Sequence, residues 1–288
     1  MFAAPCMNLS ADASFISDRA YAAQQKKEYG KEVKQIKNLI NLQAVLADRH
    51  DIEGLKQLYT DDYINSDGFN KELYFKNVKE TWDECKDLTY KTKILSIDIS
   101  GNNAAVTVDE TATGTVFETS EDFAVAGESH SKSSGIYYLT KNGGKWFISG
   151  ETLLTDESSL LYGDARFMEI ELQTPYQVNA GDSYTAALKI NADDKTFTIA
   201  SIERDPVTYP AALPSGPLRA MPKSNMLERV LTANKDNINE YAVASLAISK
   251  AVGESVDNYR IYMAGLACIM KRINVVPKNN FLKSEDKI

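Results

Sequence analysis

The chain has 288 residues, 43% of them hydrophobic and 25% charged, with a net charge of -8 and an isoelectric point of about 5.0. This length allows two domains with separate cores. The acidic balance argues against nucleic acid as a partner, because binding to phosphates depends on clustered Lys and Arg.

The first 30 residues are predicted to form a separate N-terminal segment. Residues 1–9 are apolar, and Ala11-Asp12-Ala13 has the A-x-A pattern of a signal-peptidase site, although the basic region that normally precedes it is missing. Two interpretations stay open. The favoured one is a signal-peptide remnant, hence an exported, periplasmic or cell-surface protein, and the alternative is an ordinary N-terminus of a cytoplasmic protein. No apolar run reaches the roughly 20 residues of a membrane-spanning helix, so we expect no transmembrane span.

The cysteines and histidines give no reason to expect a metal or a cofactor. Cys6, Cys85 and Cys268 are too far apart in sequence for a metal knuckle or a redox pair. His50 and His130 have no third ligand at a suitable spacing. We predict that Cys85 and Cys268 pack in the core.

Three helices are predicted in the first half. Residues 31–47 have a wide apolar stripe that also carries Gln43, and residues 51–59 form a short helix that ends at Thr60-Asp61-Asp62, where short polar side chains compete for backbone hydrogen bonds. Residues 71–87 form the third helix, with Trp82 on its apolar face.

Strands follow these helices. Alternation in residues 90–99, the Gly101-Asn102-Asn103 turn and residues 104–116 predict a hairpin. Residues 118–131 are acidic and without clear periodicity, so we predict a loop or a splayed strand end. Asn142-Gly143-Gly144 then predicts the turn of a second hairpin, because Asn and Gly tolerate positive φ.

The stretch from Asp51 to Asp67, with its Tyr59-Thr60-Asp61-Asp62 sequence, resembles the second helix and following strand of the nuclear transport factor 2-like superfamily, which includes ketosteroid isomerase and the polyketide cyclase SnoaL. The order of three helices and an antiparallel meander agrees with this. The resemblance implies a domain over residues 31–163 in which a curved antiparallel sheet wraps around helices as a cystatin-like cone with a pocket.

The second half is predicted to be an all-β domain over residues 164–280, with a tail at 281–288. Short strand-like runs at 167–172, 184–190 and 196–202 are separated by turn clusters, and a Pro-rich crossover occupies 205–224. The apolar runs at 226–233, 240–249 and 259–276 fit strands or buried helices, and strands are favoured. The architecture resembles an immunoglobulin-like β-sandwich. The whole chain is therefore predicted to be α+β.

The resemblance to ketosteroid isomerase implies a position for a catalytic base. There, a pocket Asp removes a proton next to a carbonyl, while a Tyr and a protonated Asp stabilise the oxyanion. The matching base position is Asp67, but Gln43 stands where the Tyr would be, and no second acid appears in the strand that ends at Tyr137. Asp67 beside Gly68 is also typical of a turn. The candidate pocket residues are Gln43, Tyr59, Tyr63, Asp67 and Trp82.

Two functional hypotheses follow. The favoured one is a noncatalytic exported binding or structural protein, whose cone holds a small apolar ligand and whose sandwich contacts a protein partner at the cell envelope. The alternative is an isomerase- or cyclase-type enzyme that acts on a carbonyl compound with Asp67 as general base. Either hypothesis is compatible with a homodimer.

Overall fold

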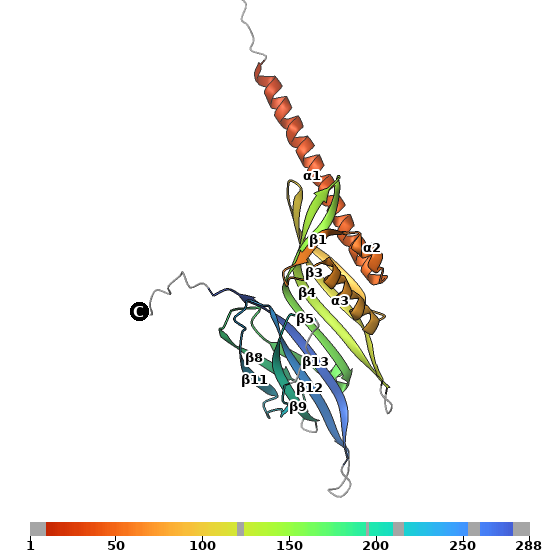
Figure 1. The fold of residues 1–288 in the computed structure, drawn as a ribbon, viewed down its shortest axis with the longest axis vertical. Coiled ribbons are helices and arrows are strands. Elements are labelled where there is room, and N and C mark those ends of the chain that lie inside the picture. Colours follow the sequence, from red (N-terminus) through yellow and green to blue (C-terminus); the bar gives the residue numbers. More distant parts are fainter. Residues whose placement is uncertain (1–9, 120–123, 194–195, 210–215, 253–259, 279–288) are drawn as a thin grey trace, which may run out of the picture.

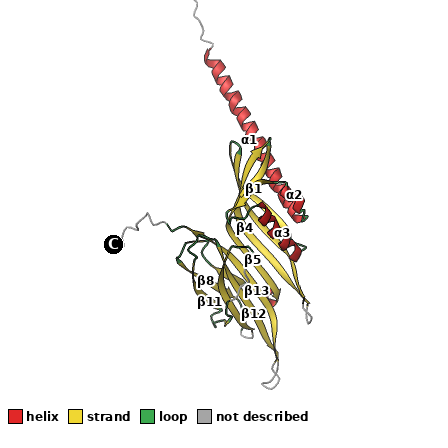
Figure 2. Ribbon diagram, viewed as in Figure 1, coloured by secondary structure: helices red, strands yellow, loops and turns green. Residues whose placement is uncertain are grey.

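The computed structural model describes residues 10–119, 124–193, 196–209, 216–252 and 260–278 of the chain. These residues are mostly in antiparallel strands, with few helices (Figure 2). Among the described helices, none is both long enough and apolar enough to cross a membrane.

The described residues of the first half form three helices and five strands, whose arrangement is drawn in Figure 1. The helices are α1 (Ser10–Asp48), α2 (Ile52–Lys56) and α3 (Lys71–Glu84). The strands are β1 (Tyr59–Asn65), β2 (Thr89–Ser100), β3 (Asn103–Thr119), β4 (Ala124–Asn142) and β5 (Lys145–Gly163). The three helices cover one face of the sheet, as in a cone, and the N-terminal part of α1 extends beyond the strands.

In the second half, the described residues form one short 3-10 helix and eight strands. They are η1 (Asp164–Phe167), β6 (Ile170–Gln173), β7 (Gln177–Asn179), β8 (Ser183–Ile190), β9 (Thr196–Pro206), β10 (Arg219–Ala220), β11 (Met226–Thr232), β12 (Glu240–Val252) and β13 (Arg260–Val276). The alternative of buried helices in the last three apolar runs is wrong, because these runs form β11, β12 and β13. The strand predicted at 167–172 begins only at Ile170, since Phe167 ends η1.

One large sheet runs through both halves. Its strands lie in the order β10-β9-β12-β13-β5-β4-β3-β2, with β1 paired to β5 and β7 to β13, while β11, β8 and β6 form a second sheet. Strand β5 pairs with β4 along most of its length and with β13 through residues 157–163. It therefore belongs to both halves. The division of the chain into two domains near residue 163 stays a prediction, as does the immunoglobulin-like sandwich.

Local sequence explains where several elements begin. The Asp51 carboxylate accepts the Gly54 N–H at 2.9 Å at the start of α2, and the Asn70 side chain accepts the Leu73 N–H at 3.0 Å at the start of α3. These are N-caps, which satisfy backbone donors that the first helical turn leaves free. The β4–β5 turn places Gly143 at φ 56°, as predicted for this hairpin.

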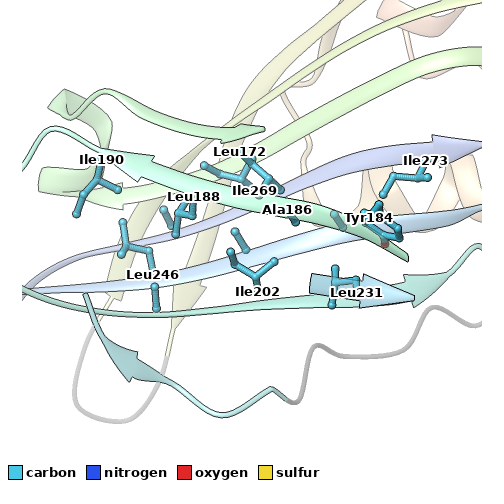
Figure 3. Close-up of a cluster of buried hydrophobic side chains, with 14 of the residues drawn as sticks. Leu172, Tyr184, Ala186, Leu188, Ile190, Ile202, Leu231, Leu246, Ile269 and Ile273 are labelled. Atoms are coloured by element: carbon cyan, nitrogen blue, oxygen red, sulfur yellow. The ribbon is translucent and has the colours of Figure 1, made fainter. Parts of the chain in front are cut away.

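Each half has its own hydrophobic core. The core of the first half contains large aromatic side chains from α3, β1 and β4, whereas that of the second half is built from small and aliphatic side chains between the two sheets (Figure 3). The buried Leu172 and Leu188 come from the small sheet, and Leu246 and Ile269 from the large one. The buried Cys85 lies in the first core, as predicted, and Cys268 is half-buried.

Two predictions about the first half are wrong. The first helix begins at Ser10, 21 residues before residue 31, so that Ala13 lies within it. Of the two alternatives for residues 118–131, the loop is wrong, because β3 pairs with β4 as far as Thr119 and Ala124. Gly127 suggested a loop, but it lies against the ring of Tyr162, where a Cβ would clash. Residues 120–123 lie outside the described part.

Candidate functional site

A cavity of about 100 Å³ lies inside the first half, between the helices and the concave face of the sheet. Ala44, Ala47, Leu55 and Val78 form an apolar part of its wall. Aromatic and polar side chains complete the lining: Tyr59, Tyr74, Phe75, Trp82, Tyr90 and Tyr137, together with Gln43, Thr92 and Glu110. An apolar cavity with a few convergent polar groups is the usual form of a small-molecule site.

The polar groups form one connected hydrogen-bond chain. Gln43 Nε2 donates to the hydroxyls of Tyr59 at 3.2 Å and Tyr137 at 3.0 Å. The Tyr137 hydroxyl donates to Glu110 Oε2 at 3.0 Å, and the Thr92 hydroxyl donates to Glu110 Oε1 at 2.9 Å. The chain therefore ends on the Glu110 carboxyl group.

Glu110 points into the cone because of its place in β3. Successive side chains of a strand alternate between its faces, and Glu110 is in phase with Val106 and Val108, which are buried in the core. Burial raises the pKa of Glu110, and the hydrogen bonds from Thr92 and Tyr137 oppose that rise. None of the described residues that line the cavity is Lys, Arg or His, so this wall offers no cation to the carboxylate.

The aromatic side chains hold one another in position. The Tyr59 ring meets Phe75 edge-on, with ring centroids 4.9 Å apart. Trp82 Nε1 donates to the Tyr90 hydroxyl at 2.8 Å, and the His50 ring stacks on Trp82 at 4.6 Å. Such packing fixes ring orientation, so the cavity is bounded by positioned rings.

Four of the five predicted pocket residues lie in or next to this cavity. Gln43, Tyr59 and Trp82 line it directly. Tyr63 lies behind them, 1% exposed, with its ring edge-on to Tyr59 at 5.1 Å. The sequence analysis did not identify Glu110, Thr92 or Tyr137 as site residues.

Asp67, the fifth candidate, does not line the cavity, and its predicted position there is wrong. Its Oδ1 accepts from Arg272 Nη2 at 2.6 Å and its Oδ2 from Arg272 Nη1 at 3.0 Å. Asn239 Nδ2 donates to the same Oδ1 at 2.8 Å. The Arg272 side chain is fully buried, and both donors belong to the second half. Asp67 thus joins the two halves, and its lone pairs are engaged in that contact.

A second buried carboxyl, Glu151, lies on β5 opposite Asn65 of β1. Burial, with the Glu110 carboxylate adding to it, raises the pKa of Glu151 to about 8. Burial also raises the pKa of Tyr59 above its usual range, and the Glu151 and Glu110 carboxylates act in the same direction. The interior of the cone therefore disfavours additional negative charge.

The described residues contain no group of three His, Cys, Asp or Glu side chains arranged to hold a metal ion. His50 Nε2 lies 3.1 Å from the Leu88 carbonyl oxygen, and His130 Nε2 lies 3.5 Å from Glu128 Oε2. The two histidines thus have local structural contacts.

No protein-family model and no curated protein matches the sequence. Solved structures match about 44% of the chain. A scytalone dehydratase candidate from Novosphingobium aromaticivorans is 15% identical, with a TM-score of 0.39, 44% of this chain and 86% of that chain covered. The hexachlorocyclohexane dehydrochlorinase LinA-type3 from Novosphingobium barchaimii is 15% identical, with a TM-score of 0.34 and coverage of 44% and 88%.

A ketosteroid isomerase-like protein from Erwinia carotovora atroseptica is also 15% identical, with a TM-score of 0.31 and coverage of 42% and 94%. Each of these likenesses covers less than half of this chain, and the resemblance to the nuclear transport factor 2-like superfamily stays a prediction from the sequence.

Proposed function

We propose that the cone binds a small, mainly apolar molecule and exchanges a proton with it through Glu110. The observation that carries this proposal is the half-buried carboxyl group of Glu110 on the wall of a mainly apolar and aromatic cavity, held by the hydroxyls of Thr92 and Tyr137. This is the isomerase-type alternative from the sequence, with Glu110 in place of Asp67 as the acid–base group.

The physical basis is the environment of Glu110. A carboxyl group in an apolar site has a raised pKa, which brings it closer to the working range of a general acid or base. Hydrogen bonds from Thr92 and Tyr137 hold both carboxyl oxygens of Glu110 in place. Such fixed geometry lowers the barrier to proton transfer between bound groups. Gln43 and Tyr137 extend the hydrogen-bond chain, and the unpaired Gln43 Oε1 can accept from a donor group of the ligand.

The test is a turnover screen with small apolar carbonyl compounds, run in parallel on the wild type, Glu110→Gln and Glu240→Gln. Glu240 is the matched control, because it is a buried carboxyl in the core of the second half. We expect Glu110→Gln to reduce the rate about a hundredfold or more, with its circular dichroism unchanged. Equal rates in Glu110→Gln and the wild type would refute the role of Glu110.

Noncatalytic binding remains a second candidate, because one observation favours it. Gln43, Tyr59, Tyr137, Thr92 and Glu110 already bond to one another, which leaves few polar groups to drive chemistry. Ligand-induced thermal stabilisation without turnover in the wild type would support this candidate. Export, a protein partner at the envelope, a sandwich that supplies the binding surface and a homodimer also stay proposals.

A further inference from the structure

The hydrogen-bond partners of the half-buried Glu110 differ from those of two buried carboxylates. Glu240 bonds to Arg204 at 3.1 Å, and Asp67 bonds to Arg272 at 2.6 Å. Glu110 bonds to two neutral hydroxyls, and the described lining of its cavity contains no basic side chain. A buried carboxylate without a cation is costly unless a partner neutralises it.

The aromatic lining points to the kind of partner that is missing. Six aromatic rings border the cavity. A cation within about 6 Å of a ring centroid is attracted to the ring face, and the attraction is strongest where water is excluded. Rings around a carboxylate are therefore suited to an ammonium group. A neutral oxygen would be attracted less strongly both to the carboxylate and to the ring faces.

A further polar atom lacks a partner beside these rings. Gln43 is 8% exposed, and its Oε1 has no hydrogen-bond partner within the described part of the chain. Its Nε2 is already used by two tyrosine hydroxyls. An unpaired buried acceptor destabilises the folded protein, and an N–H donor from a ligand would remove that cost after a small movement of the amide.

From these observations we infer that the molecule bound in the cone carries a positively charged amine on a short apolar group. The inference rests on the proposed function and specifies the ligand class of the same cavity. The ammonium group contacts Glu110 and the ring faces, and the hydrocarbon part packs on Ala44, Ala47 and Leu55. A cavity of about 100 Å³ limits the ligand to a small amine.

The experiment compares isopentylamine with isopentanol, which has the same carbon skeleton and no charge. Binding is measured by calorimetry at constant ionic strength on the wild type, Glu110→Gln and Glu240→Gln. We expect the wild type to bind the amine about tenfold or more tightly than the alcohol. The ratio of the two dissociation constants should fall to about one in Glu110→Gln and stay high in Glu240→Gln.

Other outcomes overturn the inference. A ratio of the two dissociation constants near one in the wild type shows that the cavity does not recognise charge. This outcome does not depend on the folding of any variant. A high ratio that survives Glu110→Gln shows that the amine binds elsewhere, and the absence of amine binding excludes the ligand class. Turnover of neutral carbonyl compounds is measured separately, so it can succeed where amine recognition fails, and the two proposals are distinguished.

Discussion

Two acidic side chains, Glu240 in the second half of the molecule and Glu110 in the first, have opposite surroundings. In the second half, Glu240 is fully buried, and its oxygens accept from Tyr184 at 2.9 Å and Arg204 at 3.1 Å. In the cone, Glu110 and Glu151 are half-buried and have raised pKa values. The surrounding cores also differ, since that of the second half is mainly aliphatic whereas that of the first half is rich in aromatic side chains that border the cavity.

This difference distinguishes a carboxylate that stabilises the fold from one that the proposed function uses. A neutralised carboxylate such as Glu240 fixes the packing of two sheets without providing reactivity. A carboxyl group that lacks a cation is retained at a cost to stability, and such costs are concentrated at functional sites. The contrast supports a structural role for Glu240 and the proposed acid–base role for Glu110.

The largest expected effect comes from the ion pair that joins the halves. Asp67→Ala leaves the buried Arg272 guanidinium without its carboxylate, which should lower the free energy of unfolding by about 3 to 5 kcal/mol. Urea denaturation measures this. The control is Asp61→Ala, because Asp61 pairs with Lys71 at the surface, where a pair contributes about 0 to 1 kcal/mol. Similar losses in both variants would contradict a structural role for Asp67.

Trp82→Ala tests the packing around the cavity. Removal of a large buried aromatic side chain typically costs about 3 to 5 kcal/mol. We expect about 3 kcal/mol, at the low end, because Trp82 already borders open space and water can occupy the enlarged cavity. Thermal unfolding provides the measurement. An unchanged melting temperature would mean that the Trp82 ring does not pack in the core.

Glu151 predicts a pH dependence of stability. Its folded pKa of about 8 lies above its unfolded value of 4.5, so between these values the folded protein holds a proton that the unfolded chain releases. Stability should therefore be highest below the unfolded pKa and fall as pH rises towards 8, by at most about 1.4 kcal/mol per pH unit. Urea denaturation at pH 5 to 8 should show a smaller decline in Glu151→Gln. Parallel curves would remove Glu151 as the cause.

The smallest effect on stability is expected for Glu110→Gln. The amide keeps the size of the side chain and removes the desolvation cost of a charge, so we expect a change below about 1 kcal/mol, with a slight gain at pH 8. Glu240→Ala should be clearly destabilising, because it leaves Arg204 and Tyr184 without their partner. Equal losses in the two variants, measured by urea denaturation, would contradict the contrast between the two halves.

Much of the fold could be predicted from local patterns. The periodicity of α3 and the Asn142-Gly143-Gly144 turn depend on neighbouring residues, and both were predicted correctly. The paired strand structure around Gly127 was not predicted, because this glycine is required by the ring of Tyr162, which lies on another strand. No local pattern records that contact.

The site residues also divide into those that the local sequence predicts and those that it does not. Gln43 and Trp82 could be predicted as lining residues, because each lies on an apolar helix face. Asp67 was placed wrongly because its partner, Arg272, is 205 residues away in sequence. Glu110 could have been found from the sequence, because alternation in β3 gives it the same inward orientation as Val106 and Val108. A carboxylate at such a position indicates a polar group inside a core.

Strand β5 has a consequence for any attempt to obtain the cone alone. A chain ending at Gly163 would lose β13 and leave the backbone donors and acceptors of residues 157–163 unpaired along one edge. Leu160 and Tyr162 lie on that edge. An exposed strand with apolar side chains is a template for edge-to-edge association between copies, so the isolated cone would aggregate unless a charged residue or a proline blocked this edge.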